Sequence, residues 1–292
     1  MKLATCNLPL AVIFLLLASS CVKVTLHNTP HPTTGALVVH PVWTGTDGNT
    51  PAEYAVEVDG EAARLSGTTA CYPALLSPGT KTWSLYNTAA GITVTDGFAE
   101  VNVSPTTVIT TVGNSAPVTI TENVLAEPGD FYAGTGSIDI AADDTMRLEA
   151  RAALLTRQLT LTLNITGGDA GRIVSATGLL SGVAARLSLD GTISPAPGGT
   201  ALLTFTRSGT ILSSVTPVMG IATGEKAILR LTLFYTNGST ETIESDLTDP
   251  LRDFNDKHRP VEGDLKLPAR EGNFSATIEG WKDGGGDDVE AK

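Results

Sequence analysis

Cysteine is scarce in this sequence, and the positions of its cysteines exclude an internal disulfide. The chain of 292 residues holds three cysteines, Cys6, Cys21 and Cys71. Cys6 lies in a predicted signal peptide and Cys21 at its predicted cleavage site, so Cys71 has no partner. A fold without disulfides must be held together by hydrophobic cores, even in an oxidising compartment. We expect Cys71 to be a small buried apolar residue without chemistry of its own.

Basic residues and aromatic residues are also few. The 19 Lys and Arg against 31 Asp and Glu give a formal net charge of −12. Nucleic-acid phosphates require Lys and Arg for neutralisation, so the charge argues against a nucleic-acid partner. Aromatic residues make up 5% of the chain. Proteins that bind glycans usually stack aromatic side chains on the sugars, and few aromatic residues are available here. We therefore treat a surface lipoprotein that binds glycans as the less favoured alternative function.

The motifs of common enzyme and cofactor sites are missing. The sequence has no phosphate loop, no zinc-protease helix motif and no dinucleotide fingerprint. Gly178 to Gly182 reads GLLSG, which differs from the Gly-x-Ser-x-Gly pattern of serine hydrolases. We therefore predict a protein that is not an enzyme, with no catalytic residue, no metal ligand and no cofactor.

Two groups of side chains could bind a metal by their spacing alone. His27 and His31 flank Pro30 in a Pro- and Thr-rich segment, where we expect a solvated spacer. Four aspartates could line a short helix and bind Ca²⁺, although the loop pattern specific for calcium is missing. A capped, solvated helix is the favoured interpretation of these aspartates, which are Asp246, Asp249, Asp253 and Asp256.

The apolar run near the N-terminus is too short to cross a membrane. It extends over residues 8–18 after Lys2, whereas a spanning helix needs roughly 20 apolar residues. A positive start, a short apolar stretch and then small residues are typical of a secretory signal peptide. We predict a signal peptide over residues 1–20, cut between Ser20 and Cys21.

The cysteine at the cleavage site predicts a lipid anchor. Residues 18–21 read ASSC, which resembles the lipobox of bacterial lipoproteins, in which the thiol is acylated and the chain is cut just before it. An ordinary cleavage site that happens to precede a cysteine is the alternative. Each buried methylene contributes about 0.8 kcal/mol, so two or three acyl chains hold a protein in a membrane almost permanently.

Beyond the signal peptide the hydrophobic pattern has a period of two. Residues 158–166 read QLTLTLNIT, with leucines and an isoleucine on one face and polar residues on the other, as in a half-buried strand. Four Asn-Gly or Asp-Gly pairs, which favour tight hairpin turns, follow or separate such strands, at Asp59, Asp96, Asp190 and Asn237. Short strands separated by turns predict antiparallel β-sandwiches.

Alternation lapses around residues 147–157, where we place a domain boundary near Ala153. The predicted arrangement is a spacer over 21–34, a sandwich over 35–153, a second sandwich over 154–282 and an acidic, unstructured tail over 283–292. One short helix is predicted within the second sandwich, over residues 248–255. There Asp249 would cap the helix and Pro250 would take its first position.

Several segments, taken in order, resemble the FimB/Mfa-type fimbrial anchor and minor-subunit lipoproteins of type V pili. The segments are the lipobox at Cys21, GALVVHPVW at 35–43, LLSPGTKTWSLYN at 75–87, ATGLLSGVAARLSLDG at 176–191, SDLTDPLRDFN at 245–255 and FSATIEGW at 274–281. The resemblance covers nearly the whole chain. It implies two tandem transthyretin-like sandwiches, and a pilus built by adding a strand of one subunit to the sheet of the next.

The resemblance also implies partners and a location. The expected partners are other pilus subunits, and the expected location is the outer membrane at the cell surface, which the lipid at Cys21 would contact. Stalk subunits of this family are trimmed after a basic residue, and a cut after Arg64 would separate this chain from its lipid. The first strand begins 15 residues after Cys21, at Ala36. An anchor or base subunit is therefore expected rather than a stalk subunit, and the tip is likewise a less favoured position.

Overall fold

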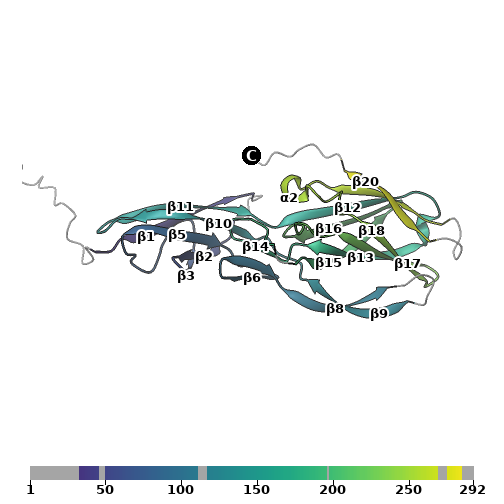
Figure 1. Cartoon of the computed structure of the whole chain (residues 1–292), viewed down its shortest axis with the longest axis horizontal. Helices are drawn as coiled ribbons and strands as arrows, with labels where there is room; N and C mark the ends of the chain where they lie inside the picture. The colour runs from purple at the N-terminus through teal and green to yellow at the C-terminus, as the bar shows by residue number, and fades with distance from the viewer. Residues whose placement is uncertain (1–32, 46–49, 111–116, 196, 269–274, 285–292) are drawn as a thin grey trace, which may run out of the picture.

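The computed structural model describes residues 33–45, 50–110, 117–195, 197–268 and 275–284. The predicted signal peptide, Ser20, Cys21, His27, His31 and most of the predicted acidic tail lie outside these ranges. Figure 1 shows an elongated molecule built almost wholly of strands, which confirms the all-β prediction. Among the described residues, no helix has both the length and the apolar character needed to cross a membrane.

The N-terminal half forms a seven-stranded sheet that curves around its own core. Its order is β3-β2-β5-β10-β11-β1-β4, and only β1 and β11 run parallel. The Tyr72 hydroxyl, next to β4, donates to the Glu61 carbonyl of β3 at 2.6 Å, which joins the two end strands. The strands are β1 (Ala36–Thr44), β2 (Glu53–Val58), β3 (Glu61–Ser66), β4 (Ala70–Cys71), β5 (Gly79–Tyr86), β10 (Tyr132–Ile140) and β11 (Thr145–Leu154).

The C-terminal half is built on a ten-stranded sheet. Eight strands follow the order β18-β17-β13-β15-β16-β12-β19-β20, and a hairpin of β8 and β9 joins them at β15. A 3₁₀-helix (Ala170–Arg172) precedes β13. The strands are β8 (Val103–Thr110), β9 (Val118–Leu125), β12 (Arg157–Ile165), β13 (Ile173–Val183), β15 (Gly199–Ser208), β16 (Ile211–Val218), β17 (Ile228–Tyr235), β18 (Thr240–Asp246), β19 (Val261–Lys266) and β20 (Thr277–Asp283).

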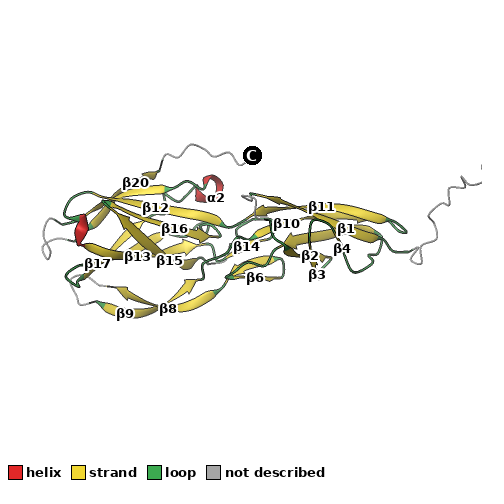
Figure 2. Ribbon diagram, turned by 180° about the vertical axis from the view of Figure 1, so that it is seen from behind, coloured by secondary structure: helices red, strands yellow, loops and turns green. Residues whose placement is uncertain are grey.

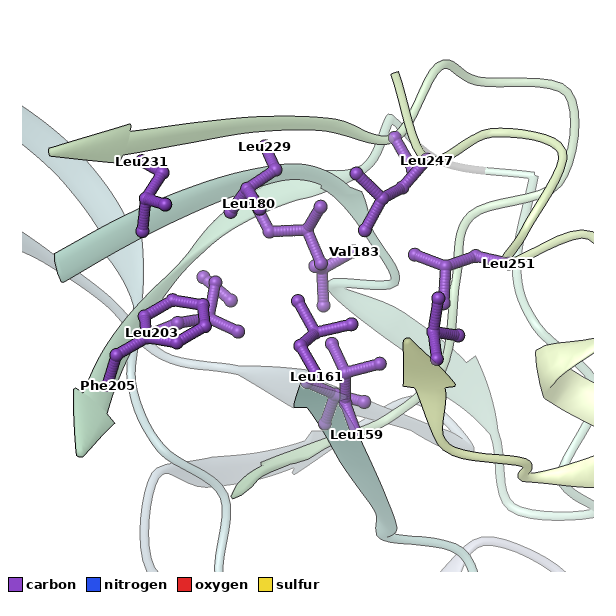
Figure 3. Packing of buried hydrophobic residues seen from close by; sticks show 14 of the residues in the cluster. Leu159, Leu161, Leu180, Val183, Leu203, Phe205, Leu229, Leu231, Leu247 and Leu251 are labelled. Atoms are coloured by element: carbon purple, nitrogen blue, oxygen red, sulfur yellow. The ribbon is translucent and has the colours of Figure 1, made fainter. Parts of the chain in front are cut away.

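Alternation along the strands produces the core of this half. In β12, Leu159, Leu161 and Leu163 are fully buried, and the intervening side chains face outward, as the sequence predicts. Figure 3 shows Leu159 and Leu161 pointing into the same interior as Leu203, Leu229 and their neighbours from the other strands. Burying each leucine contributes about 1.5–3 kcal/mol.

Side chains rather than a backbone ladder close this sheet. The Trp281 indole N–H of β20 donates to the Ser245 hydroxyl of β18 at 2.7 Å. Gly263 of β19 leaves room for the indole, since a Cβ there would lie 2.7 Å from the Trp281 ring. The end strands β18 and β20 therefore meet across a seam with Trp281 in it.

The two halves are joined by more than the connection between β11 and β12. A three-stranded sheet combines β6 (Ile92–Thr95) and β7 (Phe98–Val101) from before that connection with β14 (Arg186–Ser188) from after it. The Arg186 guanidinium stacks 3.8 Å above the Phe98 ring and its Nε lies 3.0 Å from Glu100 Oε1. This small sheet is the first of two strand connections between the halves.

The β8–β9 hairpin is the second connection, and it lies along the C-terminal sheet (Figure 1). Leu125 of β9 pairs with Ala201 of β15. Glu122 accepts from the Arg230 guanidinium of β17 at 2.6 Å. Apolar residues from before residue 153 also belong to the C-terminal core, namely Ala99, Val101, Leu125, Phe131 and Ala133.

The turns follow the predicted chemistry in part. Asp59-Gly60 and Asp96-Gly97 both have positive φ, 50° and 88° and then 51° and 75°, as a two-residue type I′ turn requires. At Asn237-Gly238 only the glycine has positive φ, and four residues separate β17 from β18. The type I′ turn predicted there is wrong, because the Asn237 side chain instead accepts from the Ser239 N–H.

The predicted helix exists but lies further along the chain. It is α2 (Phe254–Lys257), preceded by turns over residues 248–253. Asp249 therefore does not cap it, and Asp253 stands at the N-cap position. Leu251 and Phe254 are both buried in the C-terminal core. The helix ends at His258, which adopts the left-handed conformation with φ 48°.

The transthyretin-like detail and the division at residue 153 remain predictions. β11 ends at Leu154 and β12 begins at Arg157, so the sheets change close to that point. The β8–β9 hairpin nevertheless precedes residue 153 and belongs to the ten-stranded sheet.

Candidate functional site

Among the described strands, β1 is the nearest in sequence to the predicted lipid at Cys21, and it is an internal strand of its sheet. All nine residues of β1 pair with β11, from Ala36 with Thr145 to Thr44 with Ala153. On its other side β1 pairs with β4 at two positions. Figure 2 shows β1 between β11 and β4.

The core-facing side chains of β1 are fully covered. Leu37 is 1% exposed and Val39 0%, and they pack in a cluster with Leu148, Ala150 and Ala152 of β11. Burying Leu37 and Val39 contributes about 3–6 kcal/mol together. Removing β1 would expose this cluster, so the strand is an integral part of the N-terminal core.

The chain is fastened where it enters β1. Gly35 both donates to and accepts from Leu76, at 2.8 and 2.9 Å. The Thr34 carbonyl accepts from the Asp143 N–H, and the Ala36 N–H donates to the Asp144 carbonyl, both at 2.9 Å. A Cβ at position 35 would lie 2.3 Å from the Ala141 carbonyl oxygen, so only glycine fits there.

Aromatic side chains hold the other end of β1. The Trp43 ring meets Tyr54 and Tyr132 edge-on, at centroid distances of 5.8 and 5.7 Å. Such pairs add about 0.5–1.5 kcal/mol beyond the area that they bury. The Tyr54 hydroxyl is buried without a hydrogen-bond partner, and burial raises the pKa of Tyr54 above 10.0. The strand is thus held at both ends and along its length.

Arg64, the basic residue at which trimming was considered, lies in the edge strand β3. No Lys or Arg occurs between Thr44, the end of β1, and Arg64. A cut after Arg64 would therefore remove β1, β2 and most of β3 together. That loss includes the buried side chains of Tyr54, Val56 and Val58 as well as those of β1.

The histidines in the described ranges have structural contacts. His40 is exposed, and its Nδ1 lies 3.2 Å from the Thr69 hydroxyl. His258 Nε2 accepts from Arg157 Nε at 2.8 Å, which links the end of α2 to the start of β12. Burial, with Arg157 second, lowers the pKa of His258 below 6.5.

Three of the four aspartates near the predicted helix bind groups of their own segment. Asp246 accepts from the Thr248 N–H at 2.9 Å. Asp249 forms an ion pair with Arg252, and Asp253 pairs with Lys257 at 2.7 Å. Within the described part of the chain, no group of three or more His, Cys, Asp or Glu residues is placed to hold a metal ion.

The expectation that Cys71 is buried is wrong, because its side chain is exposed. β4 contains only Ala70 and Cys71, and the neighbouring Tyr72 takes the core position. The three tryptophans, all described, form no exposed platform: Trp83 is buried, and Trp43 and Trp281 are partly buried against the two cores.

One open cleft of mixed polar and apolar lining lies where the N-terminal sheet faces the small connecting sheet. Its volume is about 350 Å³, and its lining includes Glu57, Asp59, Thr82, Ser84, Gly97 and Leu189. Asp59 is paired with Lys81 at 2.8 Å. This pair and the Thr82 N–H, which also donates to Asp59, lower the pKa of the Asp59 carboxyl.

The C-terminal strand β20 contributes little to the core. It pairs with β19 alone, with a register shift between Glu262 and Asp264. Most of its side chains are exposed, and only Ile278 and Trp281 pack partly against the core. It is the more accessible of the two strands that lie nearest the ends of the described chain.

No protein-family model matches the sequence, and no curated protein matches it either. Solved structures do match. A protein described as a candidate adhesin from Bacteroides ovatus superposes with a TM-score of 0.58 at 13% identity, over 92% of this chain and 95% of that chain. The fimbrial anchor protein Mfa2 from Porphyromonas gingivalis superposes with a TM-score of 0.50 at 13% identity, over 86% of this chain and 98% of that one. The chain therefore has the fold of this adhesin-like protein and of a fimbrial anchor protein.

Proposed function

We propose that this protein is a lipid-anchored structural subunit of a cell-surface pilus, at its anchor or base, and that it supports adhesion. The observation that carries the proposal is the position of β1. This strand begins 15 residues after Cys21 and is paired over its whole length with β11. A lipid on Cys21 would thus be tied directly to a complete N-terminal core.

The likeness to a fimbrial anchor protein supports this role, as does the lipobox at Cys21. The absence of basic residues between Thr44 and Arg64 supports it further, because trimming by a protease that cuts after Arg or Lys has no position just after β1. The protein would reside in the outer membrane through its lipid and face the cell surface and the fimbrium. Its role would be structural rather than catalytic.

Contact with the next pilus subunit would occur by strand addition. Such contacts use backbone hydrogen bonds for the ladder and alternate side chains for specificity. Burial of four Val- or Leu-sized side chains at about 1.5–3 kcal/mol each yields about 6–12 kcal/mol before ordering costs. If this chain donates a strand, β20 is the available segment, since it pairs on one side only.

Glycan binding, the alternative considered from the sequence, gains no support from the tryptophans. A stacking platform needs exposed aromatic faces, whereas Trp83 is buried and the cores partly cover Trp43 and Trp281. A surface lipoprotein that binds glycans is therefore the less favoured role.

The test is intact-mass spectrometry of the chain recovered from gently extracted filaments. The expected species begins at Cys21, carries acyl chains and travels with the filaments. Cys21→Ser should abolish the lipid mass and the membrane attachment, while Cys71→Ser, which removes the other remaining thiol, should leave both intact. A lipidated chain that never accompanies filaments refutes the pilus role. A lipid-free chain that starts beyond β1 refutes the anchor role.

A further inference from the structure

We propose that the parallel pair of β1 and β11 is a mechanical clamp, which resists force by loading its hydrogen bonds together rather than one by one. For the direction of the load, this inference rests on the proposed tether at Cys21. The clamp itself is a property of strand direction and register in the described chain.

The direction of the strands sets how a pull would act. β1 and β11 are parallel, so Ala36 and Thr145 lie at one end of the pair and Thr44 and Ala153 at the other. A tether on the N-terminal side pulls on the Ala36 end of β1. The C-terminal half pulls through Leu154, at the opposite end of β11, which continues into β12 at Arg157. In Figure 1 both strands run along the long axis of the molecule.

Opposed forces on opposite ends of neighbouring strands produce shear. In shear, every bond between the strands shares the load, whereas in peeling the bonds at one end break in succession. The nine paired positions of β1 and β11 would therefore have to fail together. The bonds of Thr34 with Asp143 and of Gly35 with Leu76 add to the resistance at the point where the load arrives.

The sequence of β1 keeps the ladder to β11 uninterrupted. The Ala36 N–H donates to Asp144 in the loop before β11, whereas the Leu37 carbonyl accepts from Tyr72 on the opposite side. Donors to one neighbour recur at every second residue of a strand. The N–H groups of Val38, His40 and Val42 therefore face β11, and Pro41, which has none, falls on the other side.

The packing reinforces the ladder. Leu37 and Val39 lie beside Met146 and Leu148, their register partners on β11, and are buried in the core that also holds Ala150 and Ala152. Sliding β1 along β11 would drag these branched side chains out of their sites and separate Trp43 from Tyr54. Shear thus opposes both the hydrogen bonds and the close packing of the core.

Single-molecule force spectroscopy with two pairs of handles tests the clamp. The chain from residue 21 onward carries Cys21→Ser and Cys71→Ser, so that only the handle thiols react. Thr166→Cys, just beyond β12, provides one handle in both cases, since tension then passes straight along the backbone of β12. The other handle is Thr33→Cys, before β1, for shear, or Thr50→Cys, beyond the far end of β1, for peeling. Positions 33, 50 and 166 are exposed.

At the same constant force, the N-terminal half should survive at least about tenfold longer with the Thr33 handle than with the Thr50 handle. This factor corresponds to about 1.4 kcal/mol of barrier height, the size of one net hydrogen bond. With the Thr33 handle, the event should release at least residues 36–86, from β1 to the end of β5, which adds about 17 nm of extended chain. Equal lifetimes for the two handles would overturn the proposal.

A pair of proline variants locates the effect in the ladder. His40→Pro removes an N–H that faces β11, and it should shorten the lifetime with the Thr33 handle far more than with the Thr50 handle. Arg64→Pro is the matched control: the Gly67 N–H donates to Ala52, so by alternation the Arg64 N–H faces the open edge of β3. An equal effect of His40→Pro in both geometries would indicate general destabilisation and refute the clamp.

If His40→Pro fails to fold, the comparison of the two handles on the unsubstituted strand decides by itself. Neither measurement depends on lipid or on other subunits. A chain found without lipid in cells would overturn the anchor role and leave the force comparison unchanged. A chain without the difference between handles would overturn the clamp and leave the anchor role intact.

Discussion

A substitution at Phe131 can test whether the two halves of the molecule unfold cooperatively. Phe131 directly precedes β10 of the N-terminal sheet, yet its side chain is 0% exposed within the C-terminal core. Its backbone is fixed to the connection between the halves, because Phe131 N–H donates to the Thr156 hydroxyl at 3.1 Å and its carbonyl accepts from the Leu155 N–H at 2.8 Å. Phe131→Ala should therefore affect both halves.

The expected cost follows from the burial of the ring. Replacing a buried Phe by Ala costs about 3–5 kcal/mol, from the lost transfer free energy and the cavity that remains. If the halves unfold as one unit, this loss lowers the unfolding free energy reported by amides of β5 and β11 as well as by amides of β13 and β17. If they unfold independently, the amides of β5 and β11 keep their protection, since Phe131 is no part of the N-terminal cluster.

Hydrogen exchange followed by mass spectrometry reads both sheets in one experiment. Leu37→Ala is the mirror-image control, because Leu37 is 1% exposed and belongs to the N-terminal cluster. It should cost about 2–5 kcal/mol and should also reduce protection in β13 and β17. The coupling of the halves is refuted if Phe131→Ala lowers protection in the C-terminal half alone, or if Leu37→Ala lowers it in the N-terminal half alone.

Two further predictions concern single side chains. Folding lowers the pKa of His258 below 6.5, so as the pH falls the unfolded chain binds the proton before the folded chain does. The unfolding free energy should therefore be highest above about pH 6.5 and decrease as the pH drops toward the folded pKa. Denaturation measured between about pH 7.5 and 5.5 should show this slope, and His258→Gln should remove it while His40→Gln keeps it. Gly136→Ala places a Cβ 2.7 Å from the Trp83 ring and should cost about 1–3 kcal/mol in thermal or chemical denaturation. Ser137→Ala, at the exposed neighbouring position, should be nearly neutral, and equal stability of the two alanine variants would contradict the packing of Trp83 on Gly136.

Local patterns predicted some strands individually, among them β1 and β12. The alternation of β12 and the extent of β1 follow from the period of two, because each strand has one face in a core. Asp59-Gly60 and Asp96-Gly97 form the expected tight turns because both residues tolerate positive φ. The exposure of Cys71 and the late start of α2 were missed, because both depend on which neighbour takes the core position.

Pairing between distant strands could not be read from the sequence. β7 pairs with β14, and β9 with β15, across long stretches of chain. Neither segment differs in its local pattern from a strand that pairs with its own neighbour. Glu122 and Arg230 offer complementary charges 108 residues apart, but many such pairs exist in any sequence of this length. The candidate site is partly predictable for the same reason: β1 was expected, whereas its parallel partner β11 was not.

The shared core also has a consequence for the order in which the chain folds. Val101, Leu125 and Phe131 are synthesised early, but other members of the same core, such as Leu203 and Leu229, come much later. The β6–β7 hairpin likewise waits for β14. Contacts at such long sequence separation form slowly, since loop closure must precede them.

An N-terminal segment that emerges alone therefore carries apolar surface and open strand edges until the rest of the chain arrives. Such surfaces favour aggregation at ordinary concentrations. The chain is thus expected to need a binding partner that shields it between its emergence and the arrival of β17, a requirement that two independently folding domains in series would not have.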